Sequence, residues 1–313
     1  FGRSLAAVNL VNVLGILTGY LPVSILQAGS VWIIMNEGFK RDPKIEEVWR
    51  SYLTTGKLPR GSHLPWYESK GMRAIARHLP TDPRCQICYY PFGGLGGKLV
   101  RSLIRLQPSK MNPHLCNTCE RFAEAHPGGA ELEVSLLFAD IRGSTPLAAT
   151  MKAYEFSQLI NRFYQVTTNI IYEHGGMVEK LVGDEVAAFF VPAFVDGQNH
   201  ARAAVTAAQA ILLATGHGSA EGPWVPLGIG VHTGETYVGA VGEPGRNLDI
   251  TVLGDNVNIG SRLAGQAKTG EIVVSESARS LAALDEDELE FRTLSLKGKE
   301  DPVDAWIYAP TRE

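Results

Sequence analysis

The stretch 131–145 has the sequence ELEVSLLFADIRGST. Its first part is rich in Val, Leu and Phe, which favours a β-strand. Asp140 stands where this strand ends, and the small residues Gly143, Ser144 and Thr145 lead into a helix. A carboxylate at such a point can bind a hard cation such as Mg²⁺, and backbone N–H groups there can bind phosphate. A plain helix cap is the alternative.

Downstream of this strand, the apolar spacing predicts alternating strands and helices. An apolar stripe at helical spacing from Phe156 to Ile171 predicts a long helix that ends at Gly175 and Gly176. Further helices are expected over 199–214 and up to about residue 267. We expect strands at 177–181, 185–191, 227–233, 237–241, 251–253, 271–275, 291–296 and 303–308. The strands 227–233 and 237–241 are expected to flank a glycine turn. This order predicts an α+β domain.

A second carboxylate belongs to a turn signal in the sequence KLVGDE. Gly183 and Asp184 separate two predicted strands, which is typical of a hairpin. Asp is common in turns for conformational reasons alone. If Asp184 lies beside Asp140, the two carboxylates could instead form a two-metal site for phosphoryl chemistry.

A third polar motif is TVLGDNVNIGSR, which starts at Thr251. On a helix, Asn258 and Arg262 are four residues apart and therefore share one face. An amide beside a guanidinium suits a ribose oxygen and a phosphate. An exposed polar helix face is the other interpretation.

Four blocks in this order, FADIRGST, EKLVGDEVAAFF, GIGVHTGETYVGAVG and TVLGDNVNIGSR, resemble the class III nucleotidyl cyclases, the adenylate and guanylate cyclase catalytic domain. The resemblance covers residues 131–313. It implies a ferredoxin-like α+β catalytic domain that works as a head-to-tail homodimer, with active sites between the two domains.

The resemblance also implies roles for individual residues. Two Mg²⁺ or Mn²⁺ ions per site would be bound by Asp140, Asp184 and the backbone carbonyl of Ile141. Lys180 would read the base with Thr251, Asn258 would orient the ribose, and Arg262 would stabilise the transition state. Contacts to the phosphates are expected from Gly143, Ser144, Thr145 and either Lys297 or Lys299.

The base-reading pair favours ATP. An ammonium only donates hydrogen bonds, which suits adenine N1, whereas the hydroxyl of Thr251 can accept one from N6. Guanine would need a carboxylate where Lys180 stands. The sequence therefore predicts an adenylate cyclase that forms 3′,5′-cyclic AMP and pyrophosphate, with looser discrimination than an Asp in place of Thr251 would give. The alternatives are a guanylate cyclase, a diguanylate cyclase, and a weak or inactive cyclase-homology domain that dimerises or binds nucleotide.

Every cysteine belongs to one of two C-x-x-C pairs, Cys85/Cys88 and Cys116/Cys119. Two such turns can complete a tetrahedral site, so a structural Zn²⁺ is predicted over residues 85–119. An iron–sulfur cluster, reduced cysteines that only pack, and two redox dithiols are the alternatives. Nearby basic residues are interpreted as a solvated face rather than a DNA contact.

Residues 4–36 carry no charged side chain and are long enough to span a membrane. The segment 1–38 is therefore either a membrane anchor, which would hold a cytoplasmic catalytic domain at the inner face of the membrane, or a buried helical pair. Residues 39–84 are expected to form short helices and loops, and 120–130 a linker.

The overall composition narrows the function classes. With 45% apolar and 20% charged residues among 313, the chain is neither collagenous nor wholly disordered. A net charge of −4 argues against non-specific binding to nucleic acid.

Overall fold

The computed structural model describes residues 42–59, 69–79, 83–110, 112–195, 199–243, 248–298 and 302–310. Pro43–Glu313 form a compact unit of their own. The apolar segment 1–38 lies outside the described residues. Among the helices that are described, none has both the length and the apolar character needed to cross a membrane.

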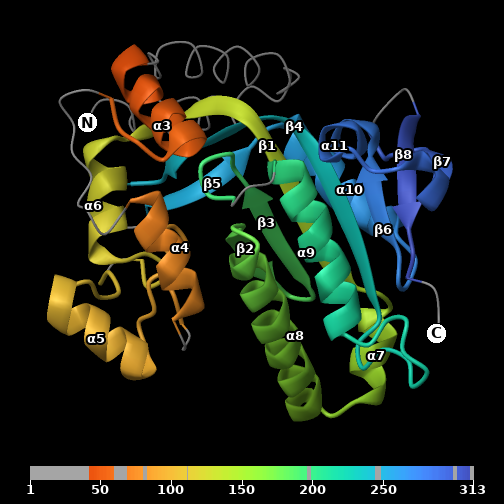
Figure 1. Cartoon of the computed structure of the whole chain (residues 1–313). Helices are drawn as coiled ribbons and strands as arrows, with labels where there is room; N and C mark the ends of the chain where they lie inside the picture. The colour runs from red at the N-terminus through yellow and green to blue at the C-terminus, as the bar shows by residue number, and fades with distance from the viewer. Residues whose placement is uncertain are drawn as a thin grey trace, which may run out of the picture. The chain divides into compact units, whose positions relative to one another are not determined.

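One mixed sheet organises the C-terminal part of the chain (Figure 1). Its strand order is β2-β3-β1-β4-β6-β8-β7, and β5 pairs with β4 beside this path. The strands are β1 (Gly128–Ile141), β2 (Met177–Val182), β3 (Glu185–Phe190), β4 (Leu227–Val241), β5 (Asp249–Leu253), β6 (Ile272–Ser275), β7 (Glu290–Leu294) and β8 (Val303–Tyr308). This architecture confirms the predicted α+β class, and β2 and β3 form the predicted hairpin.

The two longest strands, β1 and β4, lie side by side at the centre of the sheet. They pair antiparallel from Gly128 opposite Ala240 to Ile141 opposite Leu227. The expected glycine turn within 227–241 is wrong, because β4 runs through it unbroken. Gly234 serves close packing instead: a Cβ there would lie 2.7 Å from Oδ1 of Asn256.

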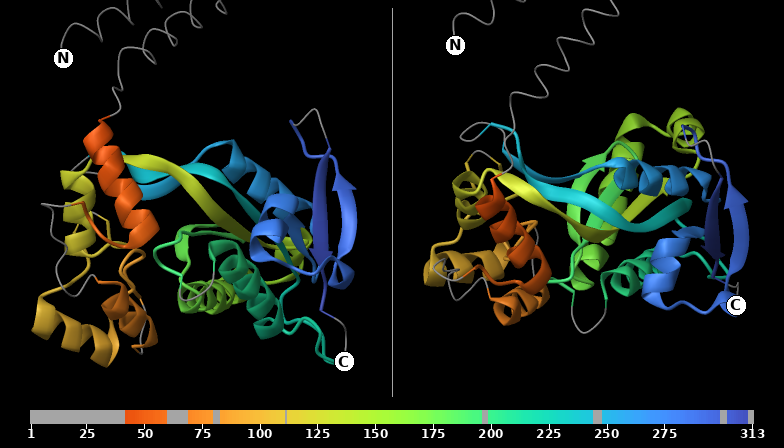
Figure 2. Two further views of the ribbon diagram at one scale, coloured as in Figure 1. Left: turned by 45° about the horizontal axis from the view of Figure 1, so that its top comes forward. Right: turned by 90° about the horizontal axis from the view of Figure 1, so that it is seen from above.

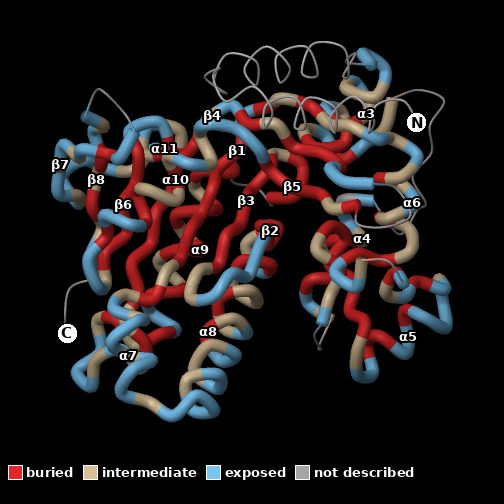
Figure 3. The backbone as a smooth tube through the Cα atoms, turned by 180° about the vertical axis from the view of Figure 1, so that it is seen from behind, coloured by how far each residue is buried: buried red, intermediate tan, exposed pale blue. Residues whose placement is uncertain are grey.

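Helices cover both faces of the sheet. Ser135 on β1 is hydrogen-bonded to His200 of α9 (His200–Ala214), while its neighbour Leu136 faces Gly260 of α10 (Asp255–Gln266). Since successive strand residues point to opposite faces, α9 and α10 lie on opposite sides. The long predicted helix is α8 (Ala153–Glu173), beside α9 and after the short α7 (Ser144–Thr150). Figure 3 shows the strands between them as buried.

Within the described residues, four helices precede the sheet and gather at one end of it, opposite the β7–β8 hairpin (Figure 2). They are α3 (Pro43–Thr55), α4 (Lys70–His78), α5 (Gly94–Ile104) and α6 (Asn117–Ala125). The short α11 (Glu276–Ala282) and a 3₁₀ turn (Glu286–Glu288) complete the described elements.

The expected linker at 120–130 is not a loop. α6 occupies its first half, and β1 begins at Gly128. Gly129 is needed for close approach of two strands, since a Cβ there would lie 2.6 Å from Cα of Gly239. Gly128 and Gly129 are therefore part of the sheet.

The packing of α10 on β4 depends on two glycines that face each other, and substitutions there test it. A Cβ at Gly230 of β4 would lie 2.7 Å from the carbonyl oxygen of Gly260, so Gly230→Ala is expected to lower the free energy of unfolding by about 1–3 kcal/mol. Gly265, also in α10, has nothing within 4 Å of its Cβ position. Gly265→Ala should therefore be neutral or stabilise by about 0.5–1 kcal/mol. Equal unfolding midpoints in denaturant for both variants would contradict this packing.

Candidate active site

Three carboxylates meet where β1 ends and the β2–β3 hairpin turns. Asp140 stands opposite Glu185 in the β1–β3 register. The backbone N–H of Ile141 donates a hydrogen bond to the carbonyl oxygen of Asp184, 3.1 Å away. The backbone of the two strands therefore brings Asp140, Ile141 and Asp184 together, as the sequence predicted.

The electrostatics of this acidic cluster favour a cation. Burial raises the pKa of Asp140. Arg142 forms an ion pair with Asp140 and lowers this pKa, whereas the negative charge of Asp184 raises it further. Burial likewise raises the pKa of Glu185, and the charges of Asp140 and Asp184 raise it further. Carboxylates that disfavour each other's charge in a half-buried place are suitable oxygen ligands for a hard cation.

Helix α10 reaches this cluster through one side chain and carries the predicted ribose and phosphate residues beside it. Ser261 lies close enough to Glu185 to lower the pKa of that carboxyl, against the larger upward effect of burial. Arg262 follows Ser261, and its Nη1 is buried with no hydrogen-bond partner in the described part of the chain. Asn258, one turn earlier, is exposed. The arginine therefore has a donor free for a ligand.

The predicted phosphate contacts are only partly described. Gly298 lies near Arg262, because a Cβ on that glycine would be 3.6 Å from Nη2 of the arginine. The exposed Lys297 is in the same loop, and Lys299 lies outside the described residues. Gly143, with a left-handed φ of 66°, comes directly before α7. Ser144 and Thr145 are the first two residues of this helix.

The two predicted base-reading residues meet at a third residue, Glu179. Thr251 on β5 donates its hydroxyl to Oε1 of Glu179 at 2.5 Å, and Nζ of Lys180 lies 2.8 Å from the same oxygen. Glu179 is buried, whereas the Lys180 side chain is 55% exposed. Strands β2 and β5 thus present a fixed hydroxyl and an accessible ammonium side by side.

This base-reading pair is separate from the acidic cluster within one protomer. Among the described residues, no hydrogen bond or ion pair joins Lys180 or Thr251 to Asp140 or Asp184. Between the two groups, the hydroxyl of Tyr164 on α8 donates to the carbonyl oxygen of Gly183 at 2.8 Å and supports the hairpin turn.

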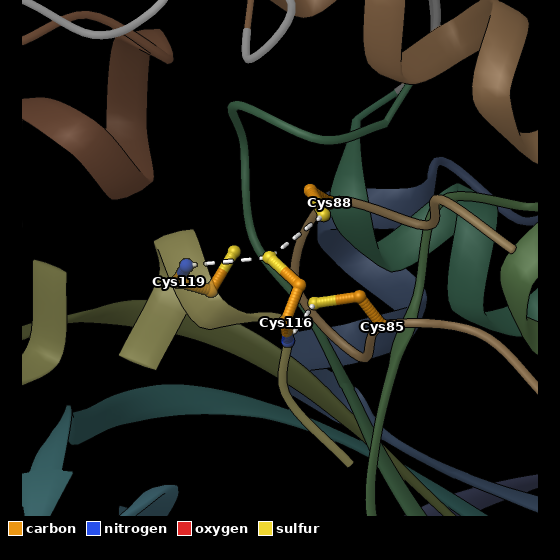
Figure 4. Close-up of side chains that lie close together, drawn as sticks. All are labelled: Cys85, Cys88, Cys116 and Cys119. Atoms are coloured by element: carbon orange, nitrogen blue, oxygen red, sulfur yellow. Dashed lines mark hydrogen bonds between the residues drawn. The ribbon is translucent and has the colours of Figure 1, made fainter. Parts of the chain in front are cut away.

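The four cysteines form one buried group, drawn in Figure 4. Their sulfur atoms all lie within 4.8 Å of one another. Burial and the thiols of Cys116 and Cys85 raise the pKa of Cys88, while Cys119 acts against the shift. For Cys85, burial works in the same direction, but hydrogen bonds from Cys116, Cys119 and Cys88 outweigh it and lower the pKa. Four thiols this close could hold a metal ion.

Loops of this four-cysteine group contact both base-reading strands. The hydroxyl of Tyr89, which follows Cys88, donates to the carbonyl oxygen of Gly175 at 3.0 Å, just before β2. The side chain of Asn112 donates to Asp249, the first residue of β5, at 3.2 Å. A cavity of about 670 Å³ lies between Gln86 and His114 on one side and α8 and β2, including Lys180, on the other.

Sequence reasoning missed three charged residues of the site. Glu185 was seen only as part of the hairpin signal, although its place after Asp184 on β3 could have suggested a third carboxylate. Arg142 was quoted in the first motif without a role, and it pairs with Asp140. Glu179 gave no signal, because its burial depends on a bulge in β2.

Comparisons with known proteins agree with this geometry. Residues 129–308 match the family model described as the adenylate and guanylate cyclase catalytic domain. An adenylate cyclase from Anabaena cylindrica is 31% identical over 182 residues, covering 54% of this chain and 35% of that enzyme. An uncharacterised protein of Mycobacterium tuberculosis is 34% identical over 181 residues, covering 56% of this chain and 31% of that protein.

A solved structure shows the same fold. The guanylyl cyclase Cya2 matches with a TM-score of 0.51 and 28% sequence identity, covering 59% of this chain and 96% of that one. The chain belongs to the adenylate and guanylate cyclase catalytic domain family. It spans about a third of the length of the two curated relatives.

The acidic cluster is expected to bind Mn²⁺ in a pH-dependent way. A protonated carboxyl is no metal ligand, and the pKa of Asp140 is raised. Affinity should therefore fall as the pH drops through that raised pKa, by up to about tenfold per pH unit below it. Electron paramagnetic resonance of free Mn²⁺, titrated with protein from pH 8 to pH 5, measures this.

Two variants make the Mn²⁺ measurement specific. Asp140→Asn should weaken binding at least about tenfold at pH 8, because a charged ligand is lost. Asp304→Asn on the distant strand β8 should bind like the wild type. Unchanged Mn²⁺ affinity in Asp140→Asn would remove the metal assignment.

Proposed function

We propose that this chain is the catalytic part of an adenylate cyclase that converts ATP to 3′,5′-cyclic AMP and pyrophosphate. The observation that carries this proposal is the meeting of Lys180 and Thr251 at one carboxylate oxygen. An ammonium that donates to N1 and a hydroxyl that accepts from N6 match adenine, whereas guanine offers a donor at N1 and an acceptor at O6.

The acidic cluster supports binding of Mg²⁺ or Mn²⁺. Asp140, Asp184 and the carbonyl oxygen of Ile141 offer the oxygen ligands that such ions prefer. The raised pKa of Asp140 means that its carboxylate is destabilised, and a bound cation would stabilise it. When bound, the ions would polarise the ribose 3′-oxygen and neutralise the triphosphate.

The remaining residues would act directly on the nucleotide. In the reaction the 3′-oxygen forms a bond to the α-phosphorus, the bond from that phosphorus to the bridging oxygen breaks, and the hydroxyl proton passes to solvent. Arg262 has a buried, unpartnered Nη1 that would stabilise charge on the α-phosphate. Asn258 would hold the ribose, and Lys297 or Lys299 the terminal phosphates, with Gly143, Ser144 and Thr145.

We further propose a head-to-tail homodimer in which each site combines the acidic cluster of one protomer with Lys180, Thr251, Asn258 and Arg262 of the other. For the base-reading pair, this division is supported by the absence, within the described residues of one protomer, of any hydrogen bond or ion pair from Lys180 or Thr251 to Asp140 or Asp184. A dimer of this kind has two equivalent sites, and neither protomer has a complete one.

Two other functions are alternatives to an active adenylate cyclase: a guanylate cyclase and an inactive cyclase-homology domain. The similarity to the guanylyl cyclase Cya2 keeps GTP as the second candidate substrate. An inactive cyclase-homology domain is less favoured, because every expected site position carries a suitable residue. Membrane attachment through residues 4–36 stays a prediction.

We propose that the four-cysteine group binds a structural Zn²⁺. Its four buried sulfurs lie close enough for tetrahedral coordination. Burial and neighbouring thiols raise the pKa of Cys88, neighbouring thiols and burial raise that of Cys119, and a cation would stabilise the thiolates. An iron–sulfur cluster needs the same four ligands and is the alternative that metal analysis would detect.

Mixing two inactive variants tests the shared site. Asp140→Ala and Arg262→Ala should each lower cyclic AMP formation at least about a hundredfold, because each removes a charge that acts on the phosphates. Random reassociation of the two should restore about a quarter of wild-type activity, since half the dimers are mixed and each of these has one intact site. Activity that stays lost in a mixture shown to exchange subunits would contradict the shared site.

Removal of one cysteine tests the metal group. Cys88→Ser should lower the bound Zn²⁺ measured by mass spectrometry and lower the thermal unfolding midpoint, because folding then lacks the free energy of metal binding. Thr118→Ala, inside the second C-x-x-C turn, is the matched control and should keep both. Full metal content in Cys88→Ser would exclude the four-thiolate site, and iron in the wild type would replace zinc.

A further inference from the structure

We propose that Glu179 is a positioning residue that sets the preference of this site for adenine over guanine by fixing the hydrogen-bonding direction of Thr251. The inference rests on the proposed adenylate cyclase function and adds to it a residue that does not itself contact the base.

Glu179 occupies an irregular position in β2. The pairing of β2 with β3 shifts register between Val178 and Lys180, so Glu179 has no opposite residue on β3. Bulges of this kind change the direction in which a side chain points. Here a carboxylate with 8% residue exposure is buried at the bulge of an edge strand, beside β5.

The contact to Thr251 fixes which way its hydroxyl works. A carboxylate oxygen only accepts, so the hydroxyl proton of Thr251 is directed to Oε1 of Glu179 at 2.5 Å. The lone pairs of the hydroxyl oxygen are then left to accept from a base. A threonine with a free hydroxyl could accept from the N6 amine of adenine or donate to O6 of guanine, but with its proton engaged it can only accept.

The contact to Lys180 adds a second restriction. Its ammonium lies 2.8 Å from the same Oε1, while its side chain is 55% exposed. Glu179 therefore keeps the ammonium beside Thr251, with both groups bound to one oxygen. This donor and acceptor together match adenine, and both mismatch guanine. Because one carboxylate orients both, Thr251 can discriminate as an acceptor without a charge of its own.

The test compares the ratio of kcat/KM for ATP to kcat/KM for GTP. Glu179→Gln can turn its amide towards Thr251 and donate to it, which frees the hydroxyl proton for guanine O6. We expect the ratio to fall about tenfold or more, the effect of one misdirected hydrogen bond. The change should lie mainly in KM, since Glu179 does not touch the phosphates. Glu173→Gln, at the exposed end of α8, is the matched control and should keep the wild-type ratio.

A double-mutant cycle distinguishes positioning from a general structural role. Thr251→Val removes the hydroxyl, and once it is absent Glu179→Gln should change the ratio little further. Thr251→Ser keeps the hydroxyl and should keep the ratio. Additive effects of Glu179→Gln and Thr251→Val would overturn the proposal, as would an unchanged ratio in Glu179→Gln. If Glu179→Gln does not fold, Glu179→Asp, which retracts the carboxylate by one methylene, should show the same fall.

These measurements distinguish failure of the Glu179 proposal from failure of the proposed adenylate cyclase function. Wild-type protein that makes cyclic AMP, with a ratio that Glu179 variants leave unchanged, would overturn only the role of Glu179. If the wild type turns over neither nucleotide, the proposed function fails. Dissociation constants for ATP and GTP from titration calorimetry would then give the same ratio, and an equal preference in wild type and Glu179→Gln would overturn the positioning role as well.

Discussion

The antiparallel register of β1 against β3 is the constraint on which the rest of the site depends. It places Asp140 opposite Glu185 and lets the backbone N–H of Ile141 bond to the carbonyl oxygen of Asp184. Side chains alternate between faces with a period of two, so a slip of one residue would turn Asp140 to the other face of the sheet and disperse the acidic cluster. The long pairing of β1 with β4 holds this register from the other side.

The hairpin that follows from this register joins two different kinds of chemistry. Its turn carries Asp184, which lies with the carboxylates proposed to bind metal, and its outer strand β2 carries Lys180, which lies beside Thr251 of β5. The four-cysteine group contacts the beginnings of both β2 and β5 through Tyr89 and Asn112. The N-terminal part of the described chain is therefore built onto the side of the cyclase domain that carries β2 and β5 rather than tethered to it.

The sequence predicted those features that depend on local pattern. Apolar spacing identified β1, α8 and the β2–β3 hairpin, and motif spacing identified Asp140, Asp184 and the two cysteine pairs. The sequence-based predictions were wrong or missing where a residue's role depends on a contact with a residue far away in the sequence. Gly234 was interpreted as a turn, but it makes room for Asn256 of α10. The role of Glu179 was not predicted. It lies buried against Thr251 at a β-bulge, and sequence periodicity does not reveal bulges.

The dependence of cyclic AMP formation on protein concentration tests the central claim most directly. With saturating ATP and Mn²⁺, a site completed by two protomers predicts an initial rate that rises with the square of the protein concentration where sedimentation finds mainly monomer. At concentrations where dimer dominates, the rate should become proportional to concentration. A rate strictly proportional to concentration throughout the monomeric range would show that one protomer holds a complete site, and would contradict the account.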